Sequence, residues 1–255
     1  MKQNSTSWEK ASGWYEDLVG KEGHYFHKEI ILPGLQRLAA FPEKSVKVLD
    51  LACGPGILTS ILPETAIYTG IDASSGLLNF ARRQRPKAQC FFKEADLSLP
   101  LSLDTADYDY AYIILALQNM AKPRVILNSA FSALKPGGKL FIVINHPCFR
   151  IPRQSHWGVD EKTKIQYRRV DTYMSELNIP IRVHPSRGID SQELASFHHP
   201  LSAYCRFLKE SGFVIETMEE WTSNKKSQGG MARAENRARA EIPLFLAIAA
   251  RKETL

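Results

Sequence analysis

The stretch from Val48 to Gly56, VLDLACGPG, is the feature that most constrains the fold of this chain. Its first half is an apolar run typical of a buried strand, and its second half places Gly54 and Gly56 directly behind that run. Glycines at a strand end let the backbone approach a ligand closely, and a helix that starts there attracts negative charge. We therefore expect this strand end to bind a nucleotide-like ligand, with an ordinary tight turn as the alternative.

Short apolar runs alternate with helical stretches after Lys47. Strands that are separated by helices imply right-handed crossovers and a parallel sheet with both faces covered. Ser74 or Ser75 is a suitable N-cap for the second helix, and Pro86 should end that helix. We expect strands at residues 46–52, 66–72, 90–95 and 108–115, a Pro-Gly-Gly turn leading into a strand that ends at 144, and helices after Gly56, at 74–85 and at about 123–134.

The C-terminal part continues this alternation with a helix at residues 200–211 and strands at 213–220 and 242–252. No helix-length apolar pattern separates these two strands, so we expect them to pair antiparallel across the long loop 221–241. The predicted fold class is α/β: a Rossmann-like, doubly wound sheet of seven strands, the last antiparallel, with helices on both faces.

The chain has 255 residues, of which 44% are hydrophobic, and this favours a single domain over residues 1–255. Residues 1–45 are interpreted as an N-terminal helical lid, because Ile30, Ile31, Leu35 and Leu38 form an apolar stripe. A segment as long as 146–199 is usually functional when it connects parts of a compact domain. The predicted divisions are the lid, a ligand-binding core at 46–145, an inserted substrate-side segment at 146–199, and a C-terminal helix and strand pair at 200–255.

Three details distinguish among nucleotide-like ligands. The dinucleotide pattern Gly-x-Gly-x-x-Gly is incomplete, because Thr59 stands where its third glycine would be. Asp50 at the strand end would repel a pyrophosphate but attract ammonium and sulfonium groups. The third detail is the sequence LKPGG before the fifth strand. In addition, Asp72 closes the second strand, where a carboxylate can accept both hydroxyls of a ribose.

Five motifs together resemble class I S-adenosylmethionine-dependent methyltransferases. They cover roughly residues 46–145 and occur in the order and spacing of that family. One departure is Ala52, at a position where glycine is commoner. Beyond Asn145 the chain is similar to a group of small bacterial methyltransferases of undefined substrate. The five motifs are DLACGPG (50–56), GIDASSGLLNFARR (70–83), EADLSLPL (94–101), YDYAYIILALQNM (108–120) and LKPGGKLFIVI (134–144).

The resemblance implies S-adenosylmethionine as the cofactor and assigns residues to its parts. The first motif would hold the methionine end, the acid of the second motif the ribose, and the third motif the adenine. Aromatic residues of the lid, whose faces attract a sulfonium, could close over the site, or could simply pack on the sheet. The predicted cofactor-binding residues are Asp50, Ala52, Cys53, Gly54, Gly56, Asp72, Ala73, Asp96, Leu97, Leu115, Gln118, Tyr15 and Tyr25. For Asp96, a turn-forming role near a strand end is the alternative.

Methyl transfer from a sulfonium is an in-line displacement, in which positioning supplies much of the rate enhancement. We expect residues 118–120, 145–149 and 221–241 to build the substrate pocket, because they follow strand ends. His146 directly follows the fifth strand and is our candidate catalytic residue, a general base. The alternative is a strand-end histidine that is hydrogen-bonded to the backbone. His24, His27, His198 and His199 are secondary candidates.

The chain carries a formal charge of +6, which favours anionic partners without establishing them. Two basic groups, one at Arg150, Arg153, Arg168 and Arg169 and one at Lys225, Lys226, Arg233 and Arg237, could hold a carboxylate or phosphate of the substrate, or could be a solvated surface. The four cysteines show neither a disulfide framework nor a zinc spacing, and no metal is expected. Without a signal peptide or a membrane-length apolar run, the predicted location is cytoplasmic.

The leading hypothesis is an enzyme that methylates a small molecule, with an anionic one as an option and the oligomeric state open. Methylation of tRNA or rRNA is the first alternative, motivated by the basic charge. Residues 117–120 read Leu-Gln-Asn-Met rather than Asn-Pro-Pro-aromatic, so a nucleic-acid partner is not expected. A non-catalytic module that only binds the cofactor is the second alternative.

Overall fold

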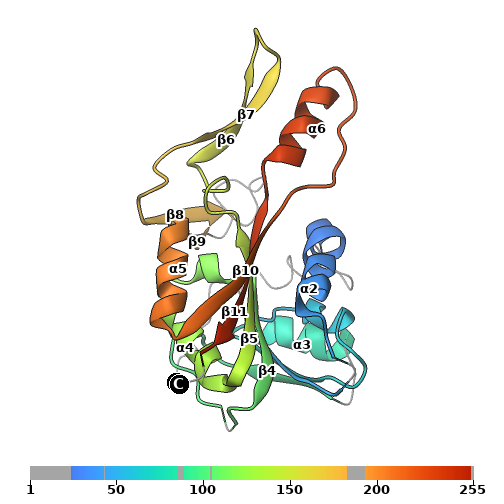
Figure 1. Ribbon diagram of the computed structural model, residues 1–255, viewed down its shortest axis with the longest axis vertical. Helices are drawn as coiled ribbons and strands as arrows, with labels where there is room; N and C mark the ends of the chain where they lie inside the picture. Colours follow the sequence, from blue (N-terminus) through green and yellow to red (C-terminus); the bar gives the residue numbers. More distant parts are fainter. Residues whose placement is uncertain (1–23, 43, 85–88, 104, 183–192, 254–255) are drawn as a thin grey trace.

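The computed structural model describes residues 24–42, 44–84, 89–103, 105–182 and 193–253. A seven-stranded sheet forms its centre, with the strand order β10-β11-β5-β4-β1-β2-β3 (Figure 1). The strands of this sheet are β1 (Lys47–Leu51), β2 (Ile67–Asp72), β3 (Cys90–Glu94), β4 (Tyr108–Ile114), β5 (Leu134–Asn145), β10 (Phe213–Trp221) and β11 (Phe245–Lys252).

Strand directions confirm the predicted doubly wound sheet with its last strand antiparallel. Five neighbouring strands, in the order β3, β2, β1, β4 and β5, run parallel to one another. Strand β11 lies between β5 and β10 and is antiparallel to both. In the middle of the sheet, Asp50 on β1 pairs with Gly70 on β2 and with Tyr112 on β4. The carboxyl ends of the parallel strands therefore meet at one edge, where open α/β sheets bind their ligands.

Helices cover both faces, and each face has its own apolar cluster. Ile31 and Leu35, one helical turn apart, are buried in one cluster, and Ile30 and Leu38 pack at its border as the apolar stripe predicts. No helix in the described residues has the length and apolar character needed to cross a bilayer. In Figure 1, α4 (Pro123–Ala133) and α5 (Leu201–Glu210) lie on one side of the sheet, and η2 (His27–Ile31), α2 (Leu32–Ala39) and α3 (Ser75–Gln84) on the other.

The helix expected after Gly56 is only the short 3-10 turn η3 (Ile57–Ser60), so this prediction was wrong in extent. Pro63 follows after two more residues, and proline cannot continue a helix. The face beside this connection is covered instead by α2, whose Leu35 belongs to the same apolar cluster as Leu58 of η3.

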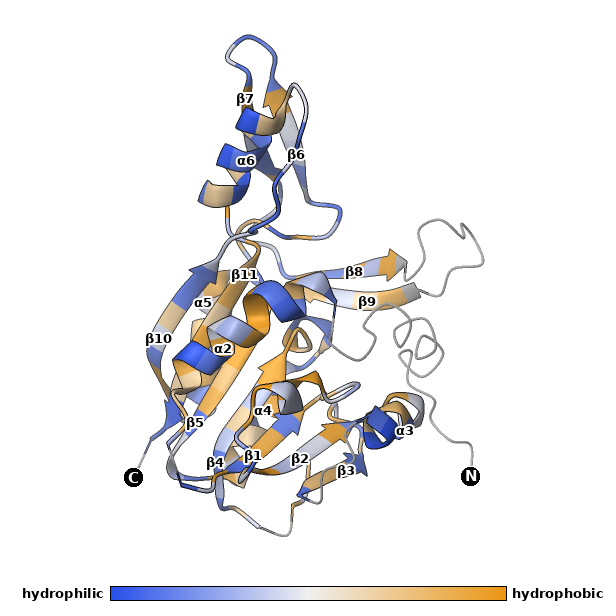
Figure 2. Ribbon diagram, turned by 90° about the vertical axis from the view of Figure 1, so that its right-hand side faces the viewer, coloured by the Kyte–Doolittle hydropathy of each residue, from blue (hydrophilic) through white to orange (hydrophobic). Residues whose placement is uncertain are grey.

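The segment 146–199 forms two antiparallel strand pairs, and the loop 221–241 contains a helix that the sequence analysis did not expect. That helix, α6 (Ala232–Glu241), buries only Ala238, so it has no apolar periodicity to reveal it. It packs against β7, and together they project beyond the sheet as a hydrophilic arm, here defined as residues 151–170 and 222–241 (Figures 1 and 2). The strand pairs are β6 (Ser155–Asp160) with β7 (Ile165–Val170), and β8 (Leu177–Arg182) with β9 (Glu193–His198).

Candidate functional site

A cavity of about 250 Å³ lies at the carboxyl ends of β1, β2 and β4. Its described wall includes residues from the loop that follows each of these strands and from the loop after β3. This is the edge of the sheet at which the sequence analysis places the cofactor. Seven predicted residues line the cavity: Ala52, Gly54, Asp72, Ala73, Asp96, Leu97 and Leu115.

The turn after β1 places three alternating residues in the left-handed region of the backbone. Ala52 has a φ of 61°, Gly54 of 52° and Gly56 of 69°. A Cβ at Gly56 would also stand 3.1 Å from the ring of Phe92. Glycine is unstrained in such conformations, whereas alanine is not. The turn therefore explains why glycine is favoured at the position of Ala52, which adopts the strained conformation while lining the cavity.

Asp72 ties the first two strand ends together. Its Oδ2 accepts a hydrogen bond of 2.8 Å from the backbone N–H of Gly54, and its Oδ1 accepts one of 2.9 Å from the N–H of Ser74. Ser74 in turn caps α3, because its Oγ accepts the N–H of Leu77 at 3.2 Å. A carboxylate offers about four acceptor positions, so Asp72 can still accept hydroxyl donors from a ligand in the cavity.

Asp50 is buried below the turn and is absent from the described wall of the cavity. The hydroxyl of Tyr68 donates a hydrogen bond of 2.8 Å to its Oδ2. Burial raises the pKa of Asp50 to about 7, with the hydrogen bond from Tyr68 lowering the pKa and the charge of Asp72 raising it further. Cys53 is also buried, and burial raises the pKa of its thiol. Both side chains are therefore buried beneath the turn, and neither lines the described cavity wall.

Asp96 and Leu97 follow β3 and line the cavity in two different ways. Leu97 is buried and presents an apolar surface. Asp96 is exposed, and its Oδ1 accepts the backbone N–H of Ser98 at 2.9 Å. The aspartate thus makes the turn that the alternative interpretation describes, and its carboxylate also stands on the cavity wall.

The end of β4 carries Leu115 and the segment 118–120, which were expected to contribute to the cofactor site and to the substrate pocket. Leu115 has a φ of 52°, and its carbonyl accepts hydrogen bonds from the side-chain amides of Gln118 at 2.9 Å and Asn119 at 3.3 Å. Asn119 and Met120 line the cavity, whereas Gln118 is absent from its described wall. The Oε1 of Gln118 is buried and has no partner among the described residues. In the short turn η4 (Leu117–Asn119), the side chain of Gln118 is thus buried in the protein interior and does not line the cavity.

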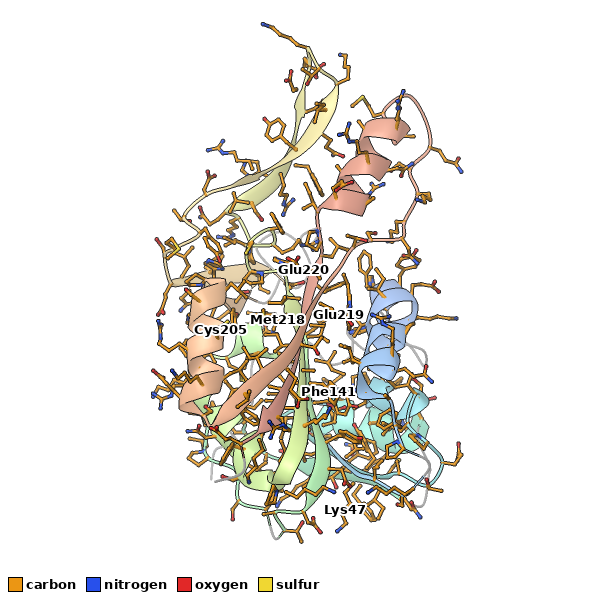
Figure 3. The ribbon with its side chains drawn as sticks, viewed as in Figure 1. Lys47, Phe141, Cys205, Met218, Glu219 and Glu220 are labelled. Atoms are coloured by element: carbon orange, nitrogen blue, oxygen red, sulfur yellow. The ribbon has the colours of Figure 1, made fainter. Side chains whose placement is uncertain are left out.

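His146 is buried, and both of its ring nitrogens are engaged. Its Nδ1 accepts the N–H of Cys148 at 3.2 Å, so Nε2 carries the proton that it shares with Glu220 Oε1 at 2.6 Å. Glu220 lies on β10, near the point where this strand leaves the sheet (Figure 3). Burial lowers the pKa of His146, although Glu220 opposes this. The described geometry matches the alternative of a strand-end histidine held by hydrogen bonds.

The secondary histidine candidates and residues 145–149 and 221–241 also stay outside the described cavity wall. His198 Nε2 lies 2.8 Å from the backbone carbonyl of Tyr173, which accepts its proton. His27, His198 and His199 are buried, and burial lowers the pKa of His27 to about 4.

The predicted lid is described only from residue 24 onward, so Tyr15 lies outside the described residues. Tyr25 is exposed and donates a hydrogen bond of 2.9 Å from its hydroxyl to Asn224 Oδ1. The ammonium of Lys225 lies 4.5 Å from the centre of the Tyr25 ring and 4.9 Å from that of Phe26. In this structure Tyr25 therefore contacts the loop before α6, and it is absent from the described cavity wall.

One wall residue comes from the segment between residues 146 and 199. Ala195 on β9 lines the cavity, and β9 packs against η4. No motif in the sequence marks Ala195, because its position depends on how the second strand pair docks on the sheet edge.

Comparisons with known proteins agree with this architecture. Residues 49–142 match the family described as a methyltransferase domain. A trans-aconitate 2-methyltransferase of Variovorax paradoxus is 34% identical over 121 residues, 46% of this chain and 46% of that protein. A ubiquinone biosynthesis O-methyltransferase of Coxiella burnetii is 31% identical over 101 residues, 38% of this chain and 43% of that protein. The matched regions thus span about half the length of these curated relatives.

Two solved structures are similar over most of the chain. An S-adenosylmethionine-dependent methyltransferase from Mesorhizobium loti has a TM-score of 0.66 and 26% identity, over 86% of this chain and 96% of that one. A second, from Listeria monocytogenes, has a TM-score of 0.66 and 22% identity, over 87% and 97%. Together with the cavity at the carboxyl edge of a sheet with this strand order, these matches show that residues 49–142 form a methyltransferase domain and that the chain has the fold of S-adenosylmethionine-dependent methyltransferases.

Proposed function

We propose that this protein transfers the methyl group of S-adenosylmethionine to a small-molecule acceptor. The observation that carries the proposal is the cavity, in which Gly54, Asp72, Asp96 and Leu97 from three consecutive strand ends share one wall. Its residues fit this cofactor: carboxylates for hydroxyl and amino donors, a glycine backbone, and apolar side chains for a ring.

Each wall residue has a role in this proposal. Asp72 accepts the ribose hydroxyls, since backbone N–H groups already hold its carboxylate in one orientation. Asp96 accepts the adenine amino group, and Leu97 and Leu115 contact the faces of the adenine ring. The backbone at Gly54 passes close to the methionine end, where the absence of a Cβ leaves space.

The cofactor, when bound, supplies an electrophilic methyl group. The chain then has to hold the attacking atom of the acceptor in line with the methyl carbon and the sulfur, and to exclude water. Asn119 at the end of η4, Met120 directly after it and Ala195 on β9 also line the cavity and are not assigned to the cofactor, so we assign acceptor positioning to them. The small-molecule class is supported by the relatives, which are named for trans-aconitate and for ubiquinone biosynthesis.

The proposal is tested by incubating the purified protein with S-adenosylmethionine labelled in its methyl group and a cell lysate separated by size. We expect label in the small-molecule fraction, and loss of at least about tenfold in cofactor affinity for Asp72→Ala, because charged hydrogen bonds are removed. Absence of cofactor binding, or label found only in RNA or protein, would refute the proposal. Cofactor binding without transfer to any fraction would instead indicate a non-catalytic module.

RNA methylation stays a second candidate because of the charge of the arm. Its forty residues contain ten Lys or Arg and four Asp or Glu, giving +6, which equals the formal charge of the whole chain. The rest of the chain is therefore formally neutral. A basic patch of this kind is the electrostatic footprint of nucleic-acid binding. Binding to RNA that weakens steeply with salt, and label in the RNA fraction, would favour this candidate.

A further inference from the structure

Arg150 lies at the same edge of the sheet as the cavity. It follows the end of β5 by five residues, and β5 is the neighbour of β4, whose last residue Ile114 lines the cavity. The backbone N–H of Arg150 donates a hydrogen bond of 2.8 Å to the carbonyl of His146, which fixes it one turn beyond the strand. Its side chain is partly buried.

Arg168 on β7 is held beside this turn by three contacts. Its Nε donates to the carbonyl of Phe149 at 2.8 Å, and its Nη2 donates to Ser155 Oγ at 2.7 Å. Its guanidinium lies 5.2 Å from the centre of the Trp157 ring. The two hydrogen bonds use two of the five N–H donors of the guanidinium and fix its orientation, so the remaining donors keep a defined direction.

Neither guanidinium has an acidic partner among the described residues. Burial lowers the pKa of Arg150, and burial together with the charge of Arg150 lowers the pKa of Arg168. Arginine nevertheless stays protonated in proteins. Two mutually repelling positive charges are thus partly withdrawn from water, an arrangement that costs free energy until an anion joins them.

Acidic side chains of the surrounding segments are paired with other groups. Asp171 pairs with Arg169 at 3.1 Å, and Glu220 with His146 at 2.6 Å. Glu161, in the turn between β6 and β7, pairs with Lys164 at 2.9 Å. Each of these carboxylates has its own partner, a cation for Asp171 and Glu161 and the His146 N–H for Glu220, so a ligand is the natural source of negative charge for Arg150 and Arg168.

We propose that Arg150 and Arg168 form an oxyanion-binding site that selects an acceptor carrying a carboxylate or a phosphate. This inference rests on the proposed small-molecule methyl transfer, and it names the class of acceptor. Guanidinium groups match the two oxygens of such an anion with paired N–H donors, and the match gives direction as well as affinity. The anionic end of the acceptor binds between the two arginines, at the edge of the sheet that also carries the cavity.

The first experiment measures anion binding directly, by titration calorimetry with citrate and with inorganic phosphate at constant ionic strength. We expect Arg150→Gln and Arg168→Gln to weaken binding of at least one probe by about tenfold or more, because a charge-assisted bidentate contact is lost. The matched control is Lys162→Gln, which removes an exposed cation between β6 and β7 and should change affinity less than about twofold. Arg150→Lys keeps the charge but loses the planar fork, so it should recover only part of the affinity.

Absence of binding to the wild-type protein, or equal losses in the Arg150→Gln and Lys162→Gln variants, would overturn the inference. Circular dichroism of each variant establishes that it is folded, and Arg150→Lys provides a folded variant if Arg150→Gln is not.

The second experiment divides the lysate acceptors by anion exchange before methyl transfer. We expect the labelled acceptor in the retained fraction, with Arg150→Gln raising KM at least about tenfold while kcat changes less. Phosphatase treatment that abolishes the acceptor identifies a phosphate, and resistance identifies a carboxylate. Transfer to a neutral acceptor with an unchanged KM would refute the inference but leave the proposed function intact, whereas failure to bind S-adenosylmethionine would refute the proposed function itself.

Discussion

The backbone N–H of Gly54 donates a hydrogen bond of 2.8 Å to Asp72 Oδ2. This contact joins the glycine turn after β1 to the end of β2, two features that lie 18 residues apart in the sequence. It means that the acid proposed to bind the ribose also holds the turn proposed to approach the methionine end. Geometry and cofactor affinity should therefore change together when Asp72 is replaced.

Replacing Asp72 by alanine is expected to reduce stability as well as cofactor binding. The substitution leaves the N–H groups of Gly54 and Ser74 without their acceptor, at a cost of about 2–4 kcal/mol in the free energy of unfolding. Urea unfolding without cofactor measures this cost. Asp96→Ala is the control at the next strand end, where only the exposed Ser98 turn is lost, and it should cost less than about 1 kcal/mol. Equal effects of the two substitutions would contradict the linking role of Asp72.

Ala52→Gly is expected to stabilise the protein by about 1 kcal/mol. Ala52 has a φ of 61°, a conformation that costs an alanine more than the extra chain entropy costs a glycine. Ala130→Gly, in the interior of α4, is the control with opposite sign and should destabilise the protein by about 1 kcal/mol. Thermal and urea unfolding measure both changes. A destabilised Ala52→Gly variant would show that the turn is not strained.

Much of the sheet could be predicted because its strands are buried on both faces. The runs around Leu49, Ile113 and Ile142 are mostly apolar and their side chains are buried, so they stand out from the amphipathic helices in the sequence. The arm could not be predicted in this way, because its elements pack mainly on one another. The helix α6 buries only Ala238 and so carries no apolar pattern, and Ile165 and Tyr167 of β7 are exposed although they alternate with polar residues.

The candidate site likewise contains some residues that could be predicted from the sequence and others that could not. Asp72, Asp96 and Leu97 could be found because each follows a predicted strand at a fixed distance, and the cavity includes them. Ala195 could not be found, because it reaches the cavity through the docking of β9 on η4. The inward rotation of Gln118 depends on the left-handed backbone at Leu115, which no residue pattern indicates.

Asp50 gives a prediction for the dependence of stability on pH. Burial raises its pKa from the ordinary value of 3.8 to about 7 in the folded protein, so the folded state keeps a proton that the unfolded state releases. Stability should therefore fall as the pH rises from about 4 to 7, by up to about 4 kcal/mol for this group. Asp50→Asn removes the titration, and its amide oxygen can still accept the Tyr68 hydroxyl. The stability of this variant relative to wild type should therefore rise as the pH increases from 5 to 8. Urea unfolding at both pH values measures this gain, and parallel pH profiles would contradict the prediction.

His146 gives the last prediction, which separates a positioning role from catalysis. His146→Gln removes the acceptor for the Cys148 N–H and the partner of Glu220, and also the contact with the Phe149 ring at 4.9 Å. We expect a loss of about 2–3 kcal/mol in the free energy of unfolding. Methyl transfer should keep the same pH profile with kcat reduced only a few-fold, because the buried ring is absent from the described cavity wall. Glu220→Gln, which keeps an oxygen acceptor for Nε2, is the control and should retain most of the stability.

A general base would behave differently: its loss would lower kcat by about 10²–10⁴-fold and remove the limb of the pH profile on which the rate rises with pH. Measuring kcat from pH 5.5 to 9 for the folded variants decides between the two roles.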